Sequence, residues 1–297
     1  MRILLLGGTG QVGWELQRSL ATLGEVTTLP RSAVDLENPD TLAEAVRAVR
    51  PDVIVSAAAH TAVDKAESEA ERAHRINAEA PGVLAEEAAR LGALLVHYST
   101  DYVFDGGGTR PWSEADTTGP LSVYGSTKLE GEQRIQASGC RHMIFRTSWV
   151  YAARGGNFAR TMLRLARDRE RLTVIDDQWG APTGADLIAD VTAHAIRGVE
   201  YHGAPAGLYH LVAGGETTWH GYASHVIAQA RVLQPDMPLA AHDIAAVPTS
   251  AFPTPARRPA NSRMDTTRLQ QAFQLRLPAW QAGVDRMLAE ILETPNR

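Results

Sequence analysis

The sequence predicts an α/β protein with a doubly wound parallel sheet, and three observations carry that prediction. Short apolar runs alternate with helical patterns over residues 1–150, the runs are continuous, and a glycine-rich turn follows the first of them directly. Parallel strands are buried on both faces and therefore read as continuous apolar runs, while a strand–helix alternation favours right-handed crossovers. A chain of 297 residues, 44% of them hydrophobic, is long enough for one large unit or two domains.

The elements of the first half follow in order. Ile3–Leu6 is a short apolar run, and apolar residues then recur at helical spacing until Gly24. Further strands are expected at Val26–Leu29, Val53–Ser56, Leu94–Tyr98 and 142–148, and further helices at Pro39–Val49, 70–91 and 122–137. A long polar loop, Asp101–Leu121, precedes the last of these helices, and loops of that length inside a domain are usually functional.

The turn Gly7–Gly13 predicts a dinucleotide site of the Rossmann type. Its glycines stand at three-residue intervals between a strand and a helix. Gly7 allows the tight turn, Gly10 keeps the helix N-terminus open to a pyrophosphate, and Gly13 lets the helix approach the sheet. The alternative is a tight turn between strand and helix that binds no dinucleotide.

The alternation of predicted strands and helices changes beyond about residue 150, where Gly155–Gly156 interrupts the chain and a rigid turn follows at Trp179–Gly184. We expect a dinucleotide-binding domain over 1–150, rejoined by parts of 185–215, and a smaller, mainly substrate-binding α/β domain over 151–297. Helices are expected at 157–169, 185–197, 218–231 and 279–292, a strand at Leu208–Val212, and an extended proline-rich connection at Val247–Pro259.

The amino-acid composition limits the kinds of molecule that the protein is expected to bind. The formal net charge is −5, so no basic field is available to hold nucleic acid or an anionic membrane surface. The N-terminal apolar run is too short for a signal peptide, and no run of the sequence reaches the roughly 20 apolar residues that a membrane span needs. The single cysteine, Cys140, excludes an internal disulfide and fits a reducing compartment. We therefore expect a cytoplasmic protein without nucleic-acid or membrane partners.

The end of the second strand points to the adenosine half of a cofactor. Arg31 lies where an acid or a base distinguishes NAD from NADP, and a base can meet a 2′-phosphate, which favours NADPH slightly over NADH. Asp35 and Leu36 lie where an adenine ring would rest, the carboxylate accepting from its amino group and the leucine packing on its face. The alternatives are a solvated Arg31 and an Asp35 that only caps the next helix.

Tyr124 and Lys128 predict nicotinamide-dependent redox chemistry. They stand four residues apart in SVYGSTK, so their side chains share a helix face. A free tyrosine titrates near ~10, and we expect the Lys128 ammonium and the helix N-terminus to lower the pKa of the phenol. Lys128 is also expected to hydrogen-bond the nicotinamide ribose. The pattern occurs by chance in many helices, and the glycine turn upstream argues against chance here.

Two further segments end at the same edge of the predicted sheet. Thr100 is expected to hydrogen-bond a substrate carbonyl together with Tyr124, or else to satisfy the loop backbone. Tyr98 is expected to pack near the cofactor. His60 follows three alanines that allow close backbone approach, and it fits a satisfied loop histidine better than a second acid. The expected reaction is hydride transfer to a ketone, with Tyr124 giving a proton to the developing alkoxide.

These residues together resemble the extended short-chain dehydrogenase/reductases and, among them, the dTDP-4-dehydrorhamnose reductase family. Beyond the glycine turn and YxxxK, the resemblance rests on strings spread over the whole chain: AAAHTAVDKAE, YSTDYVF, FRTSWVY, GAPTG, GLYHLVAGG and VPTSAFPTP. It implies reduction of the C4 ketone of dTDP-4-dehydro-L-rhamnose to dTDP-L-rhamnose with NADPH or NADH. That is the last step of dTDP-rhamnose biosynthesis, which feeds carbohydrates such as lipopolysaccharide.

The resemblance also implies roles for individual residues. Tyr124 is the implied proton donor, Thr100 the carbonyl partner and Lys128 the ribose contact. Asp101 and Trp149 match positions that touch the sugar nucleotide. The matched cofactor contacts are Gly10, Gln11, Val12, Asp35, Leu36, Ala59, His60, Thr61 and Tyr98. Pro30 stands where some members have an acid, which leaves the preference between NADPH and NADH open.

Some members of the family resemble magnesium-bridged homodimers, and Glu15, Asp186 and Glu290 stand in the corresponding places. Spread carboxylates suit a hard cation such as Mg²⁺, and they are also what a solvated helix carries. We expect a homodimer and keep the dimer-bridging metal as one alternative. Arg257 and Arg258 are expected either to meet the substrate diphosphate or to pair with nearby acids.

Two other functions are consistent with the same motifs. A nucleotide-sugar epimerase of the same superfamily takes a hydride and returns it. A non-catalytic regulatory subunit binds NADP with this fold and turns over nothing. The intact set of Tyr124, Lys128 and Thr100 argues against the regulatory subunit.

Overall fold

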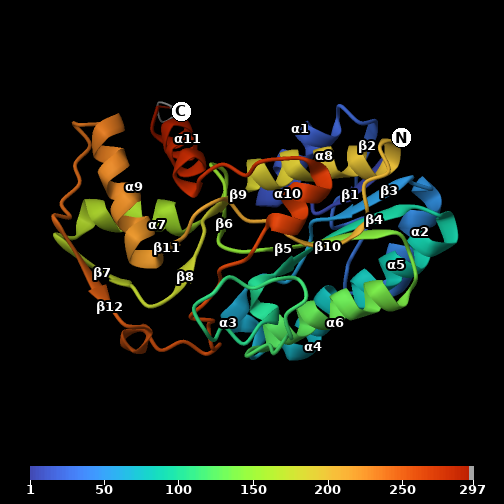
Figure 1. Cartoon of the computed structure of the whole chain (residues 1–297), viewed down its shortest axis with the longest axis horizontal. Helices are drawn as coiled ribbons and strands as arrows, with labels where there is room; N and C mark the ends of the chain where they lie inside the picture. The colour runs from blue at the N-terminus through green and yellow to red at the C-terminus, as the bar shows by residue number, and fades with distance from the viewer. Residues whose placement is uncertain (294–297) are drawn as a thin grey trace.

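The computed structural model describes residues 1–293 and is built around a six-stranded parallel sheet (Figure 1). Its strands are β1 (Arg2–Leu6), β2 (Glu25–Thr28), β3 (Val53–Ser56), β4 (Leu94–Thr100), β5 (His142–Thr147) and β10 (Gly207–His210). Their order is β10-β5-β4-β3-β1-β2, and every neighbouring pair is parallel. The predicted α/β class with a doubly wound parallel sheet is confirmed.

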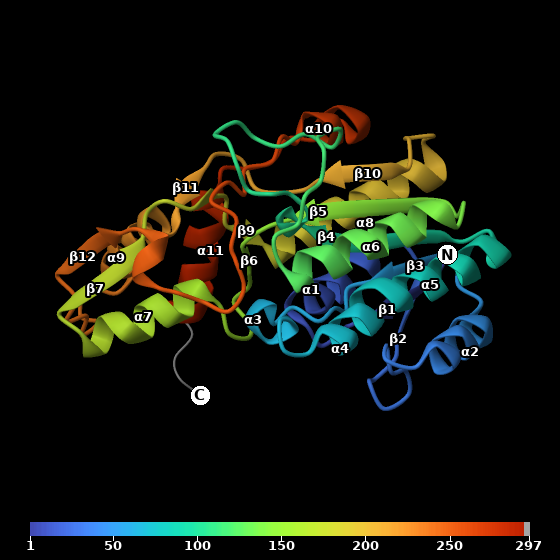
Figure 2. The ribbon, with the colours of Figure 1, turned by 90° about the horizontal axis from the view of Figure 1, so that it is seen from below.

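Helices cover both faces of this sheet. One face carries α1 (Gln11–Leu20), α8 (Ala185–Tyr201) and α10 (Thr267–Phe273), and the other carries α2 (Pro39–Val49), α5 (Ala80–Leu91) and α6 (Val123–Ala137) (Figures 1 and 2). Ile3 and Leu5 pack into the apolar core between the sheet and α1, α8 and α10. Leu4 and Leu6 pack into the core between the sheet and α2, α5 and α6. Because side chains alternate between the faces, a strand covered on both sides must be apolar throughout.

The winding of the sheet reverses between β1 and β3. From β1 the chain crosses to β2 on one side, and it then returns to β3 on the other side of β1. Ligands of open α/β sheets bind beyond the carboxyl ends of the strands at such a point. The loops after β1 and β3 touch here, because a Cβ added to Gly7 would lie 2.7 Å from the Ala58 amide nitrogen.

Most of the chain beyond β5 forms a smaller α/β assembly at the other end of the molecule (Figure 1). It contains α7 (Phe158–Asp168), α9 (Trp219–Leu233), α11 (Trp280–Glu293) and the parallel pair β7 (Arg171–Ile175) and β12 (Asp243–Val247). Two-residue strands complete it: β6 (Val150–Tyr151) with β9 (Thr183–Gly184), and β8 (Trp179–Gly180) with β11 (Thr217–Thr218). Tyr151, Tyr222 and Trp280 are buried in its core. The chain leaves this assembly to supply α8 and β10 to the sheet.

The structure differs from the sequence prediction mainly in short elements. The helix expected over 70–91 is divided into α4 (Ala70–His74), the π-helical turn η1 (Arg75–Glu79) and α5. The strands β7 and β12 and the two-residue strands were not predicted, because segments this short do not show a recognisable hydrophobic periodicity. The remaining short elements are α3 (Val63–Ala66) and the 3-10 turns η2 (Asp101–Val103) and η3 (Thr249–Ala251).

The division into domains at residue 150 stays a prediction. The last four residues of the predicted second domain, 294–297, lie outside the described residues. Within residues 1–293, no helix is both long enough and apolar enough to cross a bilayer.

Candidate active site

The glycine turn brings the start of α1 close to the sheet. Gly7 has a φ of +83°, a left-handed conformation that side chains disfavour. A Cβ at Gly13 would lie 2.0 Å from the Gly7 carbonyl oxygen, so only glycine allows this approach. No side chain caps the first amides of α1 at Gly10, and the side-chain oxygen of Gln11 is buried without a partner among the described residues. The open amides can donate to the oxygens of a pyrophosphate, whereas the Gln11 oxygen can only accept, so the amides are the groups that fit a dinucleotide.

A cavity of about 380 Å³ lies beside this turn, between the loops that follow β1, β2 and β3. Seven of the predicted cofactor residues line it: Gly7, Arg31, Asp35, Leu36, Ala59, His60 and Thr61. The residues from Gly10 to Gly13, including Val12, adjoin it at the start of α1. Tyr98, Tyr124 and Lys128 are not part of its lining. The predicted cofactor residues therefore form two groups, one around this cavity and one beyond it.

Two alternatives left open by the sequence can be decided at this cavity. Asp35 accepts a hydrogen bond from the Glu37 amide at 3.1 Å, whereas Asn38 caps α2. The alternative in which Asp35 caps the helix is therefore wrong. The Arg31 side chain is 71% exposed, yet it is not merely solvated, because it forms an ion pair with Glu37 at 3.3 Å.

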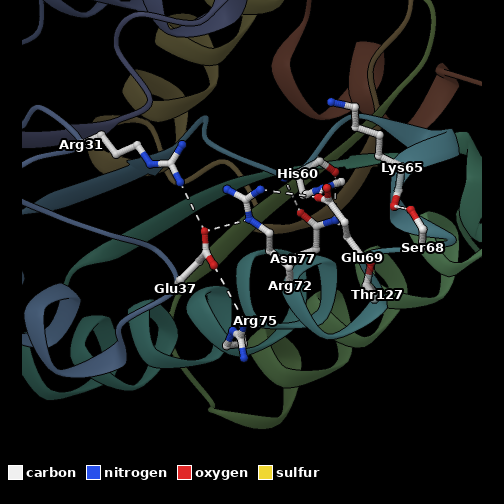
Figure 3. Close-up of polar contacts among 10 residues, drawn as sticks. All are labelled: Arg31, Glu37, His60, Lys65, Ser68, Glu69, Arg72, Arg75, Asn77 and Thr127. Atoms are coloured by element: carbon white, nitrogen blue, oxygen red, sulfur yellow. Dashed lines mark hydrogen bonds and ion pairs between the residues drawn. The ribbon is translucent and has the colours of Figure 1, made fainter.

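His60 is held in place by a residue that the sequence reasoning missed. The Asn77 side chain accepts from the His60 amide at 2.8 Å and donates to the His60 carbonyl at 3.1 Å (Figure 3). The His60 Nε2 lies 3.0 Å from a carboxylate oxygen of Glu69, whereas the Nδ1 is buried without a partner among the described residues, so the ring is only half satisfied. Asn77 is fully buried in the π-helical turn η1, and such turns are frequent at functional sites. A single asparagine in a helical run gives no sequence signal that would have found it.

Tyr124 stands in the first turn of α6, and local interactions fix the start of that helix. The Ser122 hydroxyl accepts from the Gly125 amide at 3.2 Å. A Cβ at Gly125 would lie 2.2 Å from the Tyr102 carbonyl oxygen, so glycine lets α6 pack against η2. The Tyr124 ring then meets the Tyr102 ring edge-on, with centroids 5.5 Å apart.

The pKa of the Tyr124 phenol moves against the prediction. Burial raises this pKa to about 12, while the hydrogen bond with Thr100 lowers it and the charge of Asp101 raises it. The expected depression by Lys128 is wrong in this structure, because the Lys128 ammonium turns onto β4 and donates to the Tyr98 carbonyl at 2.6 Å. A phenol with this pKa stays protonated near neutral pH, which suits a proton donor.

Lys128 is buried together with His97, a second residue that the sequence reasoning did not select. Both side chains are almost inaccessible, and the Lys128 Nζ lies 3.0 Å from the His97 Nε2. Burial lowers the pKa of Lys128 to about 8, against the charge of Glu132, which raises it. Burial and the Lys128 charge lower the pKa of His97 well below 6.5, so a neutral imidazole accepts from the ammonium. Two of the three N–H donors of Lys128 are thus used by β4.

A buried ion pair ties the same helix to β5. Arg146 donates to the two carboxylate oxygens of Glu132 at 2.9 and 2.6 Å, and both side chains are buried. The Arg146 guanidinium also lies over the Phe104 ring, 5.0 Å from its centroid. Bidentate pairing with a carboxylate fixes orientation as well as distance, so α6 is held in register with the sheet.

Thr100 and Asp101 lie beside Tyr124 at the end of β4. The Thr100 hydroxyl donates to Asp101 at 3.0 Å and accepts from the Tyr102 amide at 3.2 Å, so it satisfies the loop as well as contacting Tyr124. Burial raises the pKa of Asp101 to about 6, against the hydrogen bond from Thr100, which lowers it. The second carboxylate oxygen of Asp101 is buried without a partner in the part of the chain that the structure describes. It is therefore available to a ligand donor.

Tyr98 and Trp149 are directed toward other elements. The Tyr98 hydroxyl lies 2.8 Å from the Thr192 hydroxyl of α8. Trp149 has a φ of +49° and stacks on Trp219 with centroids 3.7 Å apart. A left-handed tryptophan is a strained conformation that packing must maintain, and such residues cluster at functional sites. Trp149 therefore links the end of β5 to the aromatic core of the smaller assembly.

The carboxylates considered for a bridging metal lie on three helices. Glu15 of α1 pairs with Arg18 at 3.6 Å, and Asp186 of α8 pairs with Arg286 at 3.3 Å. Glu290 lies on α11. Within residues 1–293, no group of three or more His, Cys, Asp or Glu side chains is placed to hold a metal ion in one chain.

The two arginines after the proline-rich stretch differ. Arg258 pairs with Asp64 at 2.7 Å, which agrees with the structural alternative. Arg257 is exposed. A diphosphate contact therefore stays a prediction for Arg257.

Comparisons with known proteins cover the whole chain. Residues 1–293 match the family model described as RmlD substrate binding domain. A dTDP-4-dehydrorhamnose reductase of Escherichia coli K12 is 58% identical over 298 residues, which is 99% of each chain. A solved dTDP-4-dehydrorhamnose reductase from Clostridium acetobutylicum has a TM-score of 0.90 and 33% identity, covering 99% of this chain and 100% of that one. Another, from Bacillus anthracis in complex with NADP, has a TM-score of 0.88 and 31% identity, covering 97% and 99%.

Proposed function

The chain belongs to the dTDP-4-dehydrorhamnose reductase family of extended short-chain dehydrogenase/reductases, and we propose that it reduces the C4 ketone of dTDP-4-dehydro-L-rhamnose to dTDP-L-rhamnose with NADPH or NADH. One observation carries the proposal. The buried phenol of Tyr124, whose pKa is raised to about 12, lies beside Thr100 at the carboxyl end of β4. A donor pair at that edge of the sheet suits a substrate carbonyl.

The chemistry divides between the cofactor and the chain. Bound NADPH or NADH supplies the hydride. Tyr124 donates its phenolic proton to the carbonyl oxygen as negative charge develops there, and the Thr100 hydroxyl, released from Asp101, donates a hydrogen bond to the same oxygen. Asp101 then keeps a free carboxylate for a sugar hydroxyl. Lys128 retains one N–H for a ribose hydroxyl, since His97 and the Tyr98 carbonyl accept the other two.

The binding residues follow from the same proposal. The open start of α1, from Gly10 to Gly13, holds the pyrophosphate, and the cavity beside it holds the adenosine. Asp35 and Leu36 contact the adenine. Ala59 to Thr61, with His60 between them, approach the cofactor through the backbone, and Tyr98 packs near it. Trp149 forms one wall of the sugar-nucleotide site.

The wider setting is part of the proposal too. We infer a cytoplasmic homodimer that supplies rhamnose for polysaccharides such as lipopolysaccharide, with residues 1–150 binding the cofactor and 151–297 mainly binding the sugar nucleotide. A magnesium ion bridging Glu15, Asp186 and Glu290 of two subunits is one way to hold that dimer. Sedimentation before and after treatment with a chelator tests the bridge, because dimers that persist without metal contradict it.

The reaction is tested with dTDP-6-deoxy-L-lyxo-4-hexulose generated in place by upstream enzymes. We expect NADPH or NADH absorbance to fall in proportion to the dTDP-L-rhamnose formed. Interconversion of sugar nucleotides without net loss of absorbance would indicate an epimerase. Cofactor binding with no turnover of either coenzyme would indicate a non-catalytic subunit.

A further inference from the structure

Trp149 is held in a strained conformation at the carboxyl edge of the central sheet. It lies two residues beyond Thr147, which pairs in register with Thr100 of β4. Its φ of +49° is left-handed, a region that a bulky side chain rarely adopts. Strain of this kind persists only where the surrounding structure maintains it, and it clusters at functional sites. The indole is half-buried, so part of it stays accessible to a ligand.

Two neighbours from the smaller assembly hold the Trp149 indole. The pairing of β8 with β11 places Gly180 beside the start of α9, where Trp219 is the first helical residue. A Cβ added to Gly180 would lie 2.8 Å from Cε2 of the Trp149 indole, so a side chain at this position would displace the ring. Trp219 stacks on the same indole, with the ring planes 15° apart. The Trp149 ring is therefore packed against both Gly180 and Trp219.

Trp219 is in turn fixed by a buried amide. Its Nε1 donates to the side-chain oxygen of Gln178 at 3.0 Å. The Gln178 side-chain nitrogen donates to the Thr249 hydroxyl at 3.0 Å, and Gln178 is buried. Because both ends of the amide are bonded, it cannot turn over without losing both bonds. A buried polar group that is satisfied in this way specifies one arrangement of the rings around it.

Filling the apolar core does not by itself require this arrangement. Trp280 is buried in the same core and meets Tyr222 edge-on, with centroids 5.9 Å apart. It is not among the residues with a left-handed backbone. The strain at Trp149 and the buried amide of Gln178 therefore serve to place one indole in one orientation.

We propose that Gln178, Gly180 and Trp219 are positioning residues for the sugar-nucleotide site, and that they act by fixing the plane of the Trp149 indole. The inference rests on the proposed function, in which Trp149 forms one wall of that site. A wall that is already ordered lowers the entropy lost when the ligand binds. The three residues thus support affinity for the sugar nucleotide, whereas the proton donors lie elsewhere, on β4 and α6.

The test compares kinetics with the keto sugar, calorimetric binding of dTDP-L-rhamnose and fluorescence titration with NADPH. Trp219→Leu removes the stacked ring, so KM for the keto sugar and Kd for dTDP-L-rhamnose should rise about three- to tenfold. We expect kcat and the Kd of NADPH to stay within about twofold. Trp219→Phe keeps a flat ring and should restore most of the affinity. Gln178→Leu keeps the stacked ring but frees it, and should weaken dTDP-L-rhamnose about threefold.

Trp280→Leu is the matched control for Trp219→Leu, because it makes the same change in the same core away from Trp149. It should lower stability in denaturant unfolding and leave the affinity for dTDP-L-rhamnose within about twofold. Gly180→Ala removes no group and only pushes against the indole, so it tests the proposal even if Trp219→Leu fails to fold. It should weaken dTDP-L-rhamnose about tenfold. Gly156→Ala, which adds a methyl group in open space, is its control.

Two results would overturn the inference. One is unchanged binding of dTDP-L-rhamnose in Gly180→Ala and in whichever Trp219 variant folds. The other is a loss of affinity for NADPH as large as that for dTDP-L-rhamnose, which would indicate general damage to the fold. An unsubstituted chain that binds dTDP-L-rhamnose but reduces no keto sugar would contradict the proposed reduction alone, and the binding results would still decide the inference. A chain that binds no dTDP-L-rhamnose would contradict both.

Discussion

The two ends of the candidate site, one around Lys128 and the other around Glu37, hold their charged groups in different environments. Around Lys128, the charged groups are buried, and the ammonium rests on two neutral acceptors from β4. Around Glu37, the side chains of Arg31, Arg72 and Arg75 are substantially exposed and share this carboxylate. Burial moves the pKa of Tyr124 to about 12 and that of Lys128 to about 8.

This difference in burial determines how strongly each region responds to a substitution of its charged groups. Desolvation penalises the charged form of a buried group, so the buried end fixes protonation states and the positions of proton donors. Exposed ion pairs contribute little free energy and exchange partners readily, so the pairs around Glu37 contribute little to stability. Substitutions at the buried end should therefore have larger effects than those around Glu37.

The largest effect is expected for Tyr124→Phe. This change removes the only proton that the proposal gives to the substrate oxygen, so kcat should fall by about 10²- to 10⁴-fold. The dissociation constant of NADPH should change little, as measured by fluorescence titration. Tyr209→Phe is the control, because Tyr209 is a buried phenol of β10 that donates to the Pro205 carbonyl. A Tyr124→Phe protein that keeps a tenth of the activity would contradict the assignment.

Glu132→Gln should produce the largest loss of stability. It leaves the Arg146 guanidinium buried without its counterion, which costs about 3–5 kcal/mol in the free energy of unfolding. Denaturant unfolding measures this loss. The control is Asp243→Asn in the exposed pair with Arg171, where a loss below about 1 kcal/mol is expected. Similar losses in the two variants would remove the contrast between buried and exposed charge.

The smallest effect is a shift in pH dependence. The pKa of Lys128 is about 8, so its ammonium is lost as the pH rises through that value, and kcat/KM should fall on the alkaline side. Tyr124, with a pKa of about 12, stays protonated over this range. In His97→Leu the ammonium loses one acceptor, so the alkaline midpoint should move down by about one pH unit.

His97→Gln supplies the matched variant, because its side-chain oxygen can accept from Lys128 and should restore part of the shift. Cofactor affinity measured at pH 7 in both variants separates this effect from general damage to the fold. An alkaline midpoint that stays in place in His97→Leu would show that His97 does not support the Lys128 charge.

Much of the fold could be predicted because its signals are local. Pro39–Val49 and Val53–Ser56 agree with α2 and β3 to the residue, since proline and asparagine mark the start of the helix and a continuous apolar run marks the strand. The break at η1 could not be predicted. It depends on Asn77 bonding to the His60 backbone and to Thr127 from another helix.

The candidate site shows the same division. The four-residue spacing, which brings two side chains to one helix face, selected Tyr124 and Lys128 together with the glycine turn upstream. Spacing could not indicate which way Lys128 turns, and the expected effect on the phenol pKa was wrong for that reason. The orientation depends on His97 and the Tyr98 carbonyl, which belong to a strand that meets α6 only in the folded chain.

The sequence by itself determined the parallel sheet, the glycine-rich turn and the residue types around Tyr124, because periodicity, glycine spacing and helical register act between near neighbours. Only the tertiary structure decided the protonation of Tyr124 and Lys128, the clamp of Asn77 on His60 and the meeting of Arg31, Glu37 and Arg72. Those properties depend on burial and on contacts between segments that crossovers bring together, and neither is encoded in any short stretch of the chain.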